Sequence, residues 1–131
     1  LKPMLKLLNC SIEGVDPKYM GIGPAVVIPK ALKLAGIKFE DVDYWELNEA
    51  FASQFIGCTI MLKDEYGMDL DTVPVNNNGS GISLGHPVGC TALRLCISLY
   101  YELERLGKTV GGASTCVGGG PAMASIWTRD I

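Results

Sequence analysis

The chain has 131 residues and a net charge of −3, with 48% hydrophobic and 19% charged residues. This length favours one domain with a single sizeable core, and the small negative charge gives no electrostatic reason to expect a nucleic acid partner. No apolar run approaches the length of a membrane span and no signal peptide opens the chain, so a membrane partner is not expected either.

A strand, a helix and a second strand are predicted in the first third of the chain. Residues 5–15 have the pattern of a strand that ends in the turn Gly14-Val15-Asp16-Pro17. Pro24 suits the first turn of a helix, because its missing N–H has no intrahelical partner there. We expect this helix to stop at Gly36, which is a natural C-terminal cap, and residues 42–47 to form a short apolar strand.

A helix, a brief strand and a glycine-rich loop are predicted next. Asn48 can cap a helix that carries apolar residues at positions 51, 55, 58 and 62 and ends near Gly67. Residues 73–75 are expected to form a brief strand. The loop at residues 76–87 closes with Gly85-His86-Pro87, and His86 is the only histidine of the chain.

The last third of the chain predicts a long helix and two strands. The helix is expected over residues 87–106, with one apolar stripe along its length. Residues 110–117 and 122–128 have strand patterns, and the Gly/Pro-rich link at residues 118–121 predicts a hairpin or a similar tight connection.

The predicted order of elements is βαβαβαββ, which indicates an α/β fold. We expect a five-stranded mixed sheet that is mainly parallel, has helices on both faces and carries an antiparallel edge formed by the last two strands. Polar groups gather where strands of such sheets end and helices begin. Asn48, His86 and Cys116 occupy such places, so their side chains are expected to converge on one pocket at the ends of the strands.

The cysteines are odd in number and widely scattered, at Cys10, Cys58, Cys90, Cys96 and Cys116. They include no C-x-x-C pair, so neither a disulfide framework nor a metal site is expected. Reduced thiols predict a cytoplasmic location. Leu1 opens the chain in place of Met, which is compatible with a piece of a longer protein.

Each candidate site residue also has an ordinary structural explanation. Asn48 can be a simple helix cap, or it can hold a water or a substrate oxygen. His86 can be structural, or it can be a neutral imidazole at a helix N-terminus that takes a proton from a thiol or donates to an oxyanion. The glycine-rich run has no G-x-x-x-x-G-K-[ST] pattern, which excludes a P-loop. Cys116 can be a small buried residue, or a thiol whose charge is stabilised by the backbone N–H groups of the glycines that follow Val117.

Three motifs in order resemble the C-terminal signatures of the thiolase family: Asn48-Glu49-Ala50-Phe51, Gly85-His86-Pro87 and Cys116-Val117-Gly118. The resemblance covers nearly the whole chain, residues 1–131, but only the C-terminal half of a thiolase. The sequence departs from the usual family pattern at Asn77, at Ser80-Gly81-Ile82 and at Ala92-Leu93, and these differences leave the motifs in place.

The resemblance implies a role for each matching residue. His86 would activate the acylated cysteine and help to form an oxyanion hole, which a water held by Asn48 would complete. Cys116 would move the proton at the α-carbon, and the N–H of Gly118 would serve a second oxyanion hole. Ala50 and Phe51 would border the pantetheine tunnel, where His86 also faces the substrate.

The same resemblance implies a reaction, a substrate and partners. The complete enzyme would be an acyl-CoA C-acyltransferase that makes or cleaves a 3-oxoacyl-CoA, with a coenzyme A thioester as substrate and no further cofactor. The acyl-accepting cysteine would belong to a separate N-terminal domain, so this chain alone is expected to be inactive. An N-terminal thiolase domain is therefore the expected partner, and the complete enzyme is expected to be a homo-oligomer.

Two alternatives stay open at this point. A β-ketoacyl synthase-like condensing enzyme would typically carry His or Asn where Cys116 stands. A non-catalytic module that binds acyl-CoA or assembles with a partner would need no nucleophile at all. The thiolase resemblance, by contrast, implies an exposed apolar face that borders the motif loops and binds an N-terminal thiolase domain or a second copy.

Overall fold

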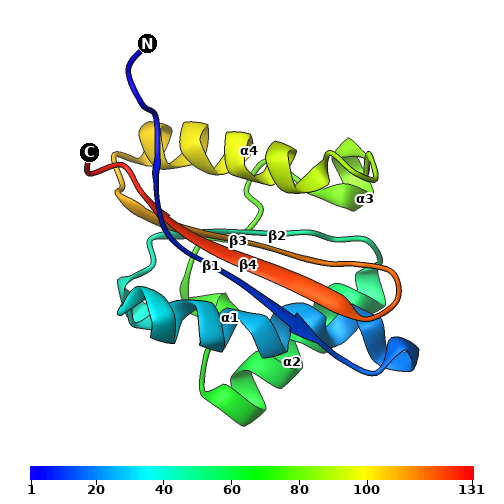
Figure 1. The fold of residues 1–131 in the computed structure, drawn as a ribbon. Helices are drawn as coiled ribbons and strands as arrows, with labels where there is room; N and C mark the ends of the chain where they lie inside the picture. The colour runs from blue at the N-terminus through cyan, green and yellow to red at the C-terminus, as the bar shows by residue number, and fades with distance from the viewer.

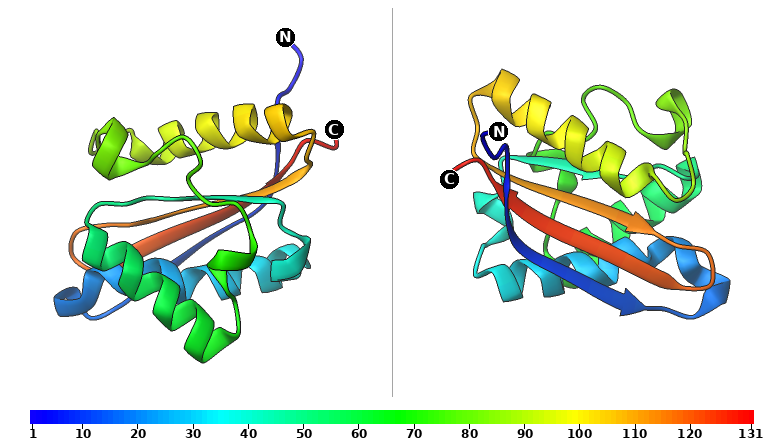
Figure 2. Two further views of the ribbon diagram at one scale, coloured as in Figure 1. Left: turned by 180° about the vertical axis from the view of Figure 1, so that it is seen from behind. Right: turned by 45° about the horizontal axis from the view of Figure 1, so that its top comes forward.

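The computed structural model describes all residues, 1–131, as a mixed β-sheet covered by helices on both faces. Helices α1 (Gly23–Ala35) and α2 (Ala52–Tyr66) lie on one side of the sheet, and α3 (Gly81–Leu84) and α4 (Thr91–Leu106) lie on the other (Figures 1 and 2). The predicted α/β class and the two helical layers are therefore confirmed. No helix is both long and apolar enough to cross a bilayer.

The strands and the short 3₁₀ turns connect these helices. The strands are β1 (Lys6–Gly14), β2 (Tyr44–Leu47), β3 (Val110–Cys116) and β4 (Pro121–Thr128). The 3₁₀ segments are η1 (Pro17–Ile22), η2 (Phe39–Asp41) and η3 (Leu70–Thr72).

The strand order across the sheet is β1-β4-β3-β2. Strands β2 and β3 are parallel, with Leu47 opposite Ser114, whereas β4 pairs antiparallel with both β3 and β1. The predicted antiparallel pairing of the last two strands is confirmed. The prediction of a mainly parallel sheet is wrong, because β4 inserts between β1 and β3 and leaves β1 at the edge.

The sheet has four strands, so the prediction of five is wrong. Residues 73–75 contribute only an isolated bridge between Val75 and Trp45. Trp45 N donates to Pro74 O at 3.0 Å, and Asn76 N donates to Trp45 O at 3.0 Å. Pro74 has no N–H, and Asn76 has a φ of 51°, which leaves the extended region, so the ladder cannot continue in either direction.

Two helices begin later than the sequence indicated. The capping position of α2 is Phe51 rather than Asn48, with an extended backbone and no side-chain cap. Helix α4 begins at Thr91 rather than at residue 87, because Gly89 has a φ of 88°, which a right-handed helix excludes. His86 consequently lies in a loop before the helix and not in its first turn.

Hydrophobic residues form one core on each face of the sheet. The larger core lies against α1 and α2, whereas the smaller lies under α4 and contains Leu95, Leu99 and Leu103. A second apolar stripe of α4 faces away from this sheet, with Leu93 61%, Ile97 50% and Tyr101 58% exposed. A helix that is apolar on two sides is normally covered on both, so the outer stripe of α4 is a candidate interface.

Candidate active site

Asn48 extends the β2–β3 ladder by one residue and buries its side chain completely. Its N–H donates to Ser114 O at 2.9 Å, which places it beside β3 at the carboxyl end of the two parallel strands. Neither the oxygen nor the nitrogen of its side-chain amide has a hydrogen-bond partner in the protein. A buried unpaired polar group costs about 1–3 kcal/mol, so this amide is suited to holding a water or a substrate oxygen. The explanation of Asn48 as a helix cap is wrong.

The glycine-rich loop holds the backbone on either side of Asn48. Asn76 accepts from Leu47 N at 2.9 Å and donates to Leu47 O at 2.8 Å. Ser80 Oγ donates to Leu47 O at 3.1 Å and accepts from Glu49 N at 3.3 Å. These bonds fix the peptide that carries Asn48 against a loop about thirty residues away, since the pairs are separated by 29 to 33 positions.

Gly81 brings the start of α3 against the same segment. A β-carbon at Gly81 would lie 2.5 Å from Glu49 O and 2.9 Å from Asn48 Oδ1. Both distances are shorter than van der Waals contact, so only glycine fits at this position. Figures 1 and 2 show α3 at the end of the sheet where β3 turns into β4. The loop, the end of β2 and the β3–β4 turn therefore meet at one end of the domain.

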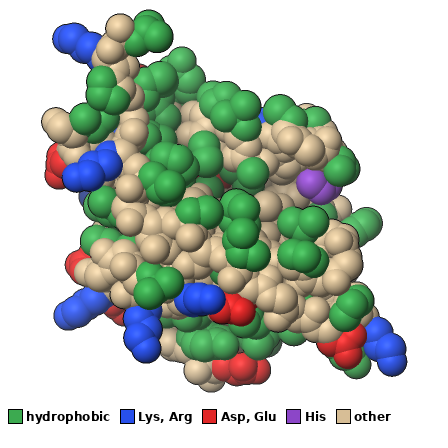
Figure 3. All heavy atoms as spheres, viewed as in Figure 1, with side chains coloured by type: hydrophobic (Ala, Val, Ile, Leu, Met, Phe, Trp, Pro, Cys, Tyr) green, Lys and Arg blue, Asp and Glu red, His purple; other side chains and the backbone are tan.

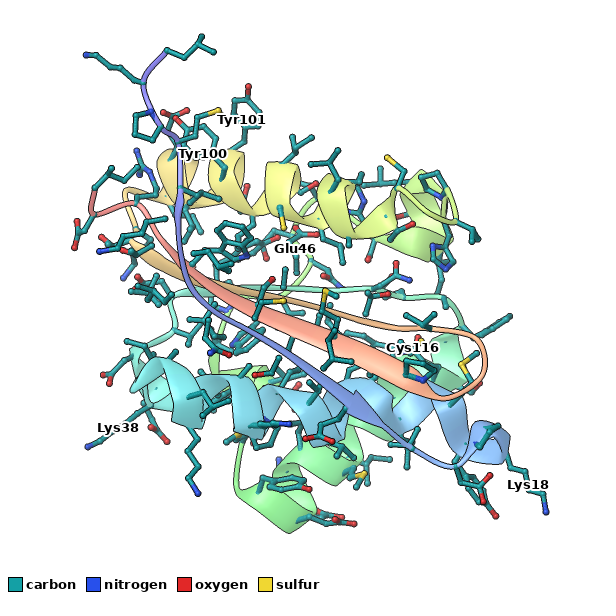
Figure 4. The ribbon with its side chains drawn as sticks, viewed as in Figure 1. Lys18, Lys38, Glu46, Tyr100, Tyr101 and Cys116 are labelled. Atoms are coloured by element: carbon teal, nitrogen blue, oxygen red, sulfur yellow. The ribbon has the colours of Figure 1, made fainter.

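Cys116 is the last residue of β3 and is buried. Figure 4 places it close to the β3–β4 turn. Burial raises the pKa of the Cys116 thiol above its usual value, so the group holds its proton at neutral pH. A protonated thiol is suited to giving a proton to a carbanion.

The turn after Cys116 leaves two backbone donors without a protein acceptor. Val117 N donates to Pro121 O at 2.8 Å and Gly120 N donates to Val117 O at 3.2 Å, whereas the N–H groups of exposed Gly118 and Gly119 donate to no protein acceptor. An exposed, fixed N–H beside a thiol is the kind of donor that oxyanion holes use.

His86 lies in the exposed loop between α3 and α4, and Figure 3 shows the single histidine at the molecular surface. Its Nδ1 is 2.6 Å from Thr91 Oγ1. The loop follows α3, which contacts the Asn48 segment, so topology brings His86 toward the end of the sheet that carries Asn48 and Cys116. Convergence of the three side chains on one pocket stays a prediction.

Ala50 and Phe51 form the approach to α2. Ala50 N donates to Gln54 Oε1 at 3.1 Å, which fixes the chain before the helix, and the Phe51 ring is 62% exposed. A large exposed aromatic side chain next to Asn48 offers an apolar contact surface for a ligand.

A buried ion pair behind the loop was not predicted from the sequence. Glu46 is fully buried, and its carboxylate accepts from Arg94 at 3.2 Å and from the Tyr44 hydroxyl at 2.7 Å. Arg94 also donates to Ser80 Oγ at 3.3 Å, so the pair connects β2, α4 and the glycine-rich loop. Burial raises the pKa of Glu46, although Tyr44 and Arg94 act to lower it. Figure 4 shows Glu46 between the sheet and α4.

A second buried carboxylate fixes the start of the same loop. Glu102 accepts from Asn77 Nδ2 at 3.0 Å and from Asn78 Nδ2 at 2.8 Å, and it is paired with Arg105. The Arg105 guanidinium, together with these amides, lowers the pKa of Glu102 to about 2. A charged residue inside an apolar strand is the signal that could have located Glu46, whereas nothing local distinguishes Glu102 on its helix.

An apolar groove of about 180 Å³ lies beside α4 over the sheet. Its lining includes Leu7, Cys10, Leu93, Cys96, Met123 and Trp127. None of Asn48, His86 and Cys116 lines it, so it is separate from the candidate active site.

The geometry defines an α/β domain with a buried amide and a protonated thiol at the ends of two neighbouring strands, and with a histidine in the loop between α3 and α4. The family model of the thiolase C-terminal domain matches residues 1–129. A 3-ketoacyl-CoA thiolase of Bacillus subtilis is 44% identical over 127 residues, which are 97% of this chain and 31% of that protein.

Solved structures agree with this comparison. The acetyl-CoA acetyltransferase of Syntrophomonas wolfei superimposes with a TM-score of 0.96 at 66% identity, over 100% of this chain and 33% of that chain. The human mitochondrial 3-ketoacyl-CoA thiolase in complex with CoA gives a TM-score of 0.88 at 38% identity, over 99% and 32%. The chain belongs to the thiolase family and corresponds to the C-terminal domain of its members. It spans about a third of the length of these relatives.

Proposed function

We propose that this chain is the C-terminal catalytic part of an acyl-CoA C-acyltransferase, which makes or cleaves a 3-oxoacyl-CoA. The observation that carries the proposal is the fully buried, unpartnered amide of Asn48 beside β3, the strand that ends in the protonated thiol of Cys116. This pair offers an oxygen-binding group and a proton donor at the same end of the sheet, as the breaking of a carbon–carbon bond next to a thioester requires.

His86 and Cys116 have distinct roles in cleavage of the 3-oxoacyl-CoA. His86 takes the proton of an incoming cysteine thiol, and the sulfur attacks the 3-oxo carbon of the substrate. The C2–C3 bond then breaks, and its electron pair goes into the thioester enolate. Cys116 gives its proton to C2 of that enolate and takes a proton back from the incoming coenzyme A thiol. The coenzyme A sulfur then takes the acyl group, and His86 returns its proton to the departing cysteine sulfur.

Four further residues support these reaction steps. Asn48 holds a water that completes an oxyanion hole with His86, and the free N–H of Gly118 serves a second oxyanion hole. Ala50 and Phe51 border the channel for the pantetheine arm. The substrate is a coenzyme A thioester, and no further cofactor is proposed.

The acyl-accepting cysteine comes from a separate N-terminal domain. None of Cys10, Cys58, Cys90 and Cys96 lies in a matching motif, and burial raises the pKa values of Cys58, to about 11, and of Cys96. The exposed outer stripe of α4 supports a second domain packed against this helix. We propose a homo-oligomer for the complete enzyme.

A cytoplasmic location is also a proposal. It rests on the unpaired cysteines of the chain. One of the solved relatives is a mitochondrial protein, so membership of the family is compatible with more than one compartment.

A non-catalytic, acyl-CoA-binding or assembly module is the second candidate function, because the chain carries no matching nucleophile. Such a module would need neither an oxyanion donor at Gly118 nor a proton-donating thiol at Cys116. A β-ketoacyl synthase-like enzyme is the third candidate, and Cys116 argues against it since those enzymes typically place His or Asn there.

A chimera tests the proposal. The Syntrophomonas wolfei acetyltransferase is cut where its similarity to this chain begins, and its remaining C-terminal third is replaced by residues 1–131. We expect CoA-dependent cleavage of acetoacetyl-CoA by the chimera and none by the 131-residue chain alone. A folded chimera without activity would favour the non-catalytic module, and cleavage by the chain alone would refute the need for an external nucleophile.

A further inference from the structure

We infer that Thr91 is a positioning residue that holds His86 in one tautomer, with the proton on Nδ1 and a free lone pair on Nε2. The inference rests on the proposed role of His86 as the base. It concerns a residue outside all three signature motifs, five positions after the histidine.

The Thr91 hydroxyl makes two polar contacts. Oγ1 lies 2.6 Å from His86 Nδ1 and 3.1 Å from Pro87 O. A hydroxyl has one hydrogen to give and can accept through its lone pairs. Pro87 O is a carbonyl oxygen and can only accept, so the hydroxyl hydrogen must point to it if that contact is a hydrogen bond.

Only one arrangement then makes both contacts hydrogen bonds. With its hydrogen directed to Pro87 O, Thr91 Oγ1 can only accept from the ring, so Nδ1 must carry the proton. Threonine hydroxyls commonly donate to the backbone carbonyl four residues earlier. The neutral ring keeps its lone pair on Nε2, which is the state that a base needs before it takes the proton of a thiol.

The surroundings make this bond important for the ring. Thr91 is buried, at 4% exposure, as the first residue of α4, whereas His86 is exposed. Gly85 and Gly89 flank the histidine loop with φ values of 103° and 88°. Thr91 is the only side chain that bonds the ring, so a rigid helix terminus orients a side chain that otherwise lies in an open loop.

Nuclear magnetic resonance tests the inference without any activity assay. His86 is the only histidine, so a ¹⁵N-histidine-labelled chain gives one pair of ring nitrogen signals. Long-range ¹H–¹⁵N spectra, recorded at a pH where the ring is neutral, assign the proton to Nδ1 or Nε2. We expect Nδ1–H in the parent chain and in Thr91→Ser, and a mixed population or Nε2–H in Thr91→Val.

The outcomes separate clearly. Nε2–H in the parent chain, or an unchanged tautomer in Thr91→Val, overturns the inference. Backbone amide spectra report whether Thr91→Val folds, and Thr91→Ala replaces it if the valine methyl group disrupts the helix start. An inactive chimera would refute the proposed function while leaving the tautomer measurement intact.

Kinetics of the chimera provide the second readout. We expect Thr91→Val to lower kcat on the order of tenfold or more with little change in KM, and Thr91→Ser to restore most of the rate. An orienting partner that fixes a histidine tautomer acts on the chemical step and not on substrate binding. Equal rates for the valine variant and the parent would overturn the positioning role.

Discussion

Replacement of Arg94 by methionine should strongly destabilise the domain, because Glu46 would lose the cation that compensates its buried charge. The Glu46 carboxylate is fully buried and its Oε2 lies 3.2 Å from Arg94 Nη1. Removing one partner of a buried pair typically costs about 3–5 kcal/mol. Arg94 retains 19% side-chain exposure, which places the expected loss near the lower end, at about 3 kcal/mol.

The stability loss of Arg94→Met should depend on pH in a definite direction. Burial already raises the pKa of Glu46, and loss of Arg94 raises it further because the cation lowers it. A carboxyl whose pKa is raised by folding opposes stability while it is ionised, and the penalty disappears as the pH falls and the group takes up a proton. The difference in unfolding free energy between Arg94→Met and the parent should therefore be largest near neutral pH and smaller toward the ordinary glutamate pKa of 4.5.

Urea unfolding followed by tryptophan fluorescence measures this difference, since Trp45 is fully buried. The matched control is Glu46→Gln with Arg94→Met, in which the amide oxygen still accepts from the Tyr44 hydroxyl. The double variant should recover at least about 1 kcal/mol of the loss, because no buried charge remains. A loss below about 1 kcal/mol, or one that does not change with pH, would refute the assignment of a buried, compensated charge.

Four further substitutions test the packing and the loop. Leu99→Ala should lower the free energy of unfolding in urea by about 2–5 kcal/mol, because Leu99 is fully buried. Leu93→Ala on the exposed stripe should lower it by no more than about 0.5 kcal/mol. Equal losses would contradict the assignment of the two faces of α4. Glu102→Gln should destabilise the domain above pH 4.5 and lose its effect as the pH falls to about 2. The pKa of Glu102 is lowered by folding, so this carboxylate contributes stability only while it is ionised. A loss of stability that does not change with pH would contradict the pairing with Arg105. Gly81→Ala should cost about 1–3 kcal/mol, because its β-carbon would meet Glu49 O at 2.5 Å, and an unchanged stability would contradict the close contact between α3 and the Asn48 segment.

Local chemistry predicted most of the elements, because helix and strand signals lie within each segment. Pro24 near the start of α1 and Gly36 after its end defined that helix, and the Gly/Pro link after β3 predicted the antiparallel pairing with β4. The predicted order of helices and strands therefore matches the fold over most of the chain.

Long-range pairing explains the errors. Nothing within residues 121–128 tells that β4 inserts between β1 and β3, because that placement depends on residues more than a hundred positions away. Residues 73–75 have a strand composition, but Pro74 and the positive φ of Asn76 limit them to one bridge. The late start of α4 depends on the positive φ of Gly89, which a sequence allows but does not require.

The candidate site likewise contains residues that the sequence predicted and residues that only the structure revealed. The motifs located Asn48, His86 and Cys116, whereas their supporting residues came only from the structure. Glu46 and Arg94 are separated by 48 positions, and no local pattern connects them. Thr91 lies close to His86 in sequence, but its role depends on the geometry of a loop that begins and ends with glycine.

The most direct test of the account is hydrogen exchange at the α-carbon of acetyl-CoA in deuterated water, catalysed by the chimera and by its Cys116→Ala variant. Exchange requires a group that takes and returns a proton at carbon, whereas transfer of the acyl group between the nucleophilic cysteine and labelled CoA moves no proton at carbon. We predict that Cys116→Ala abolishes exchange and acetoacetyl-CoA cleavage while acyl transfer to labelled CoA continues. Undiminished exchange in Cys116→Ala would contradict the central claim that this domain supplies the acid and base for carbon–carbon bond chemistry.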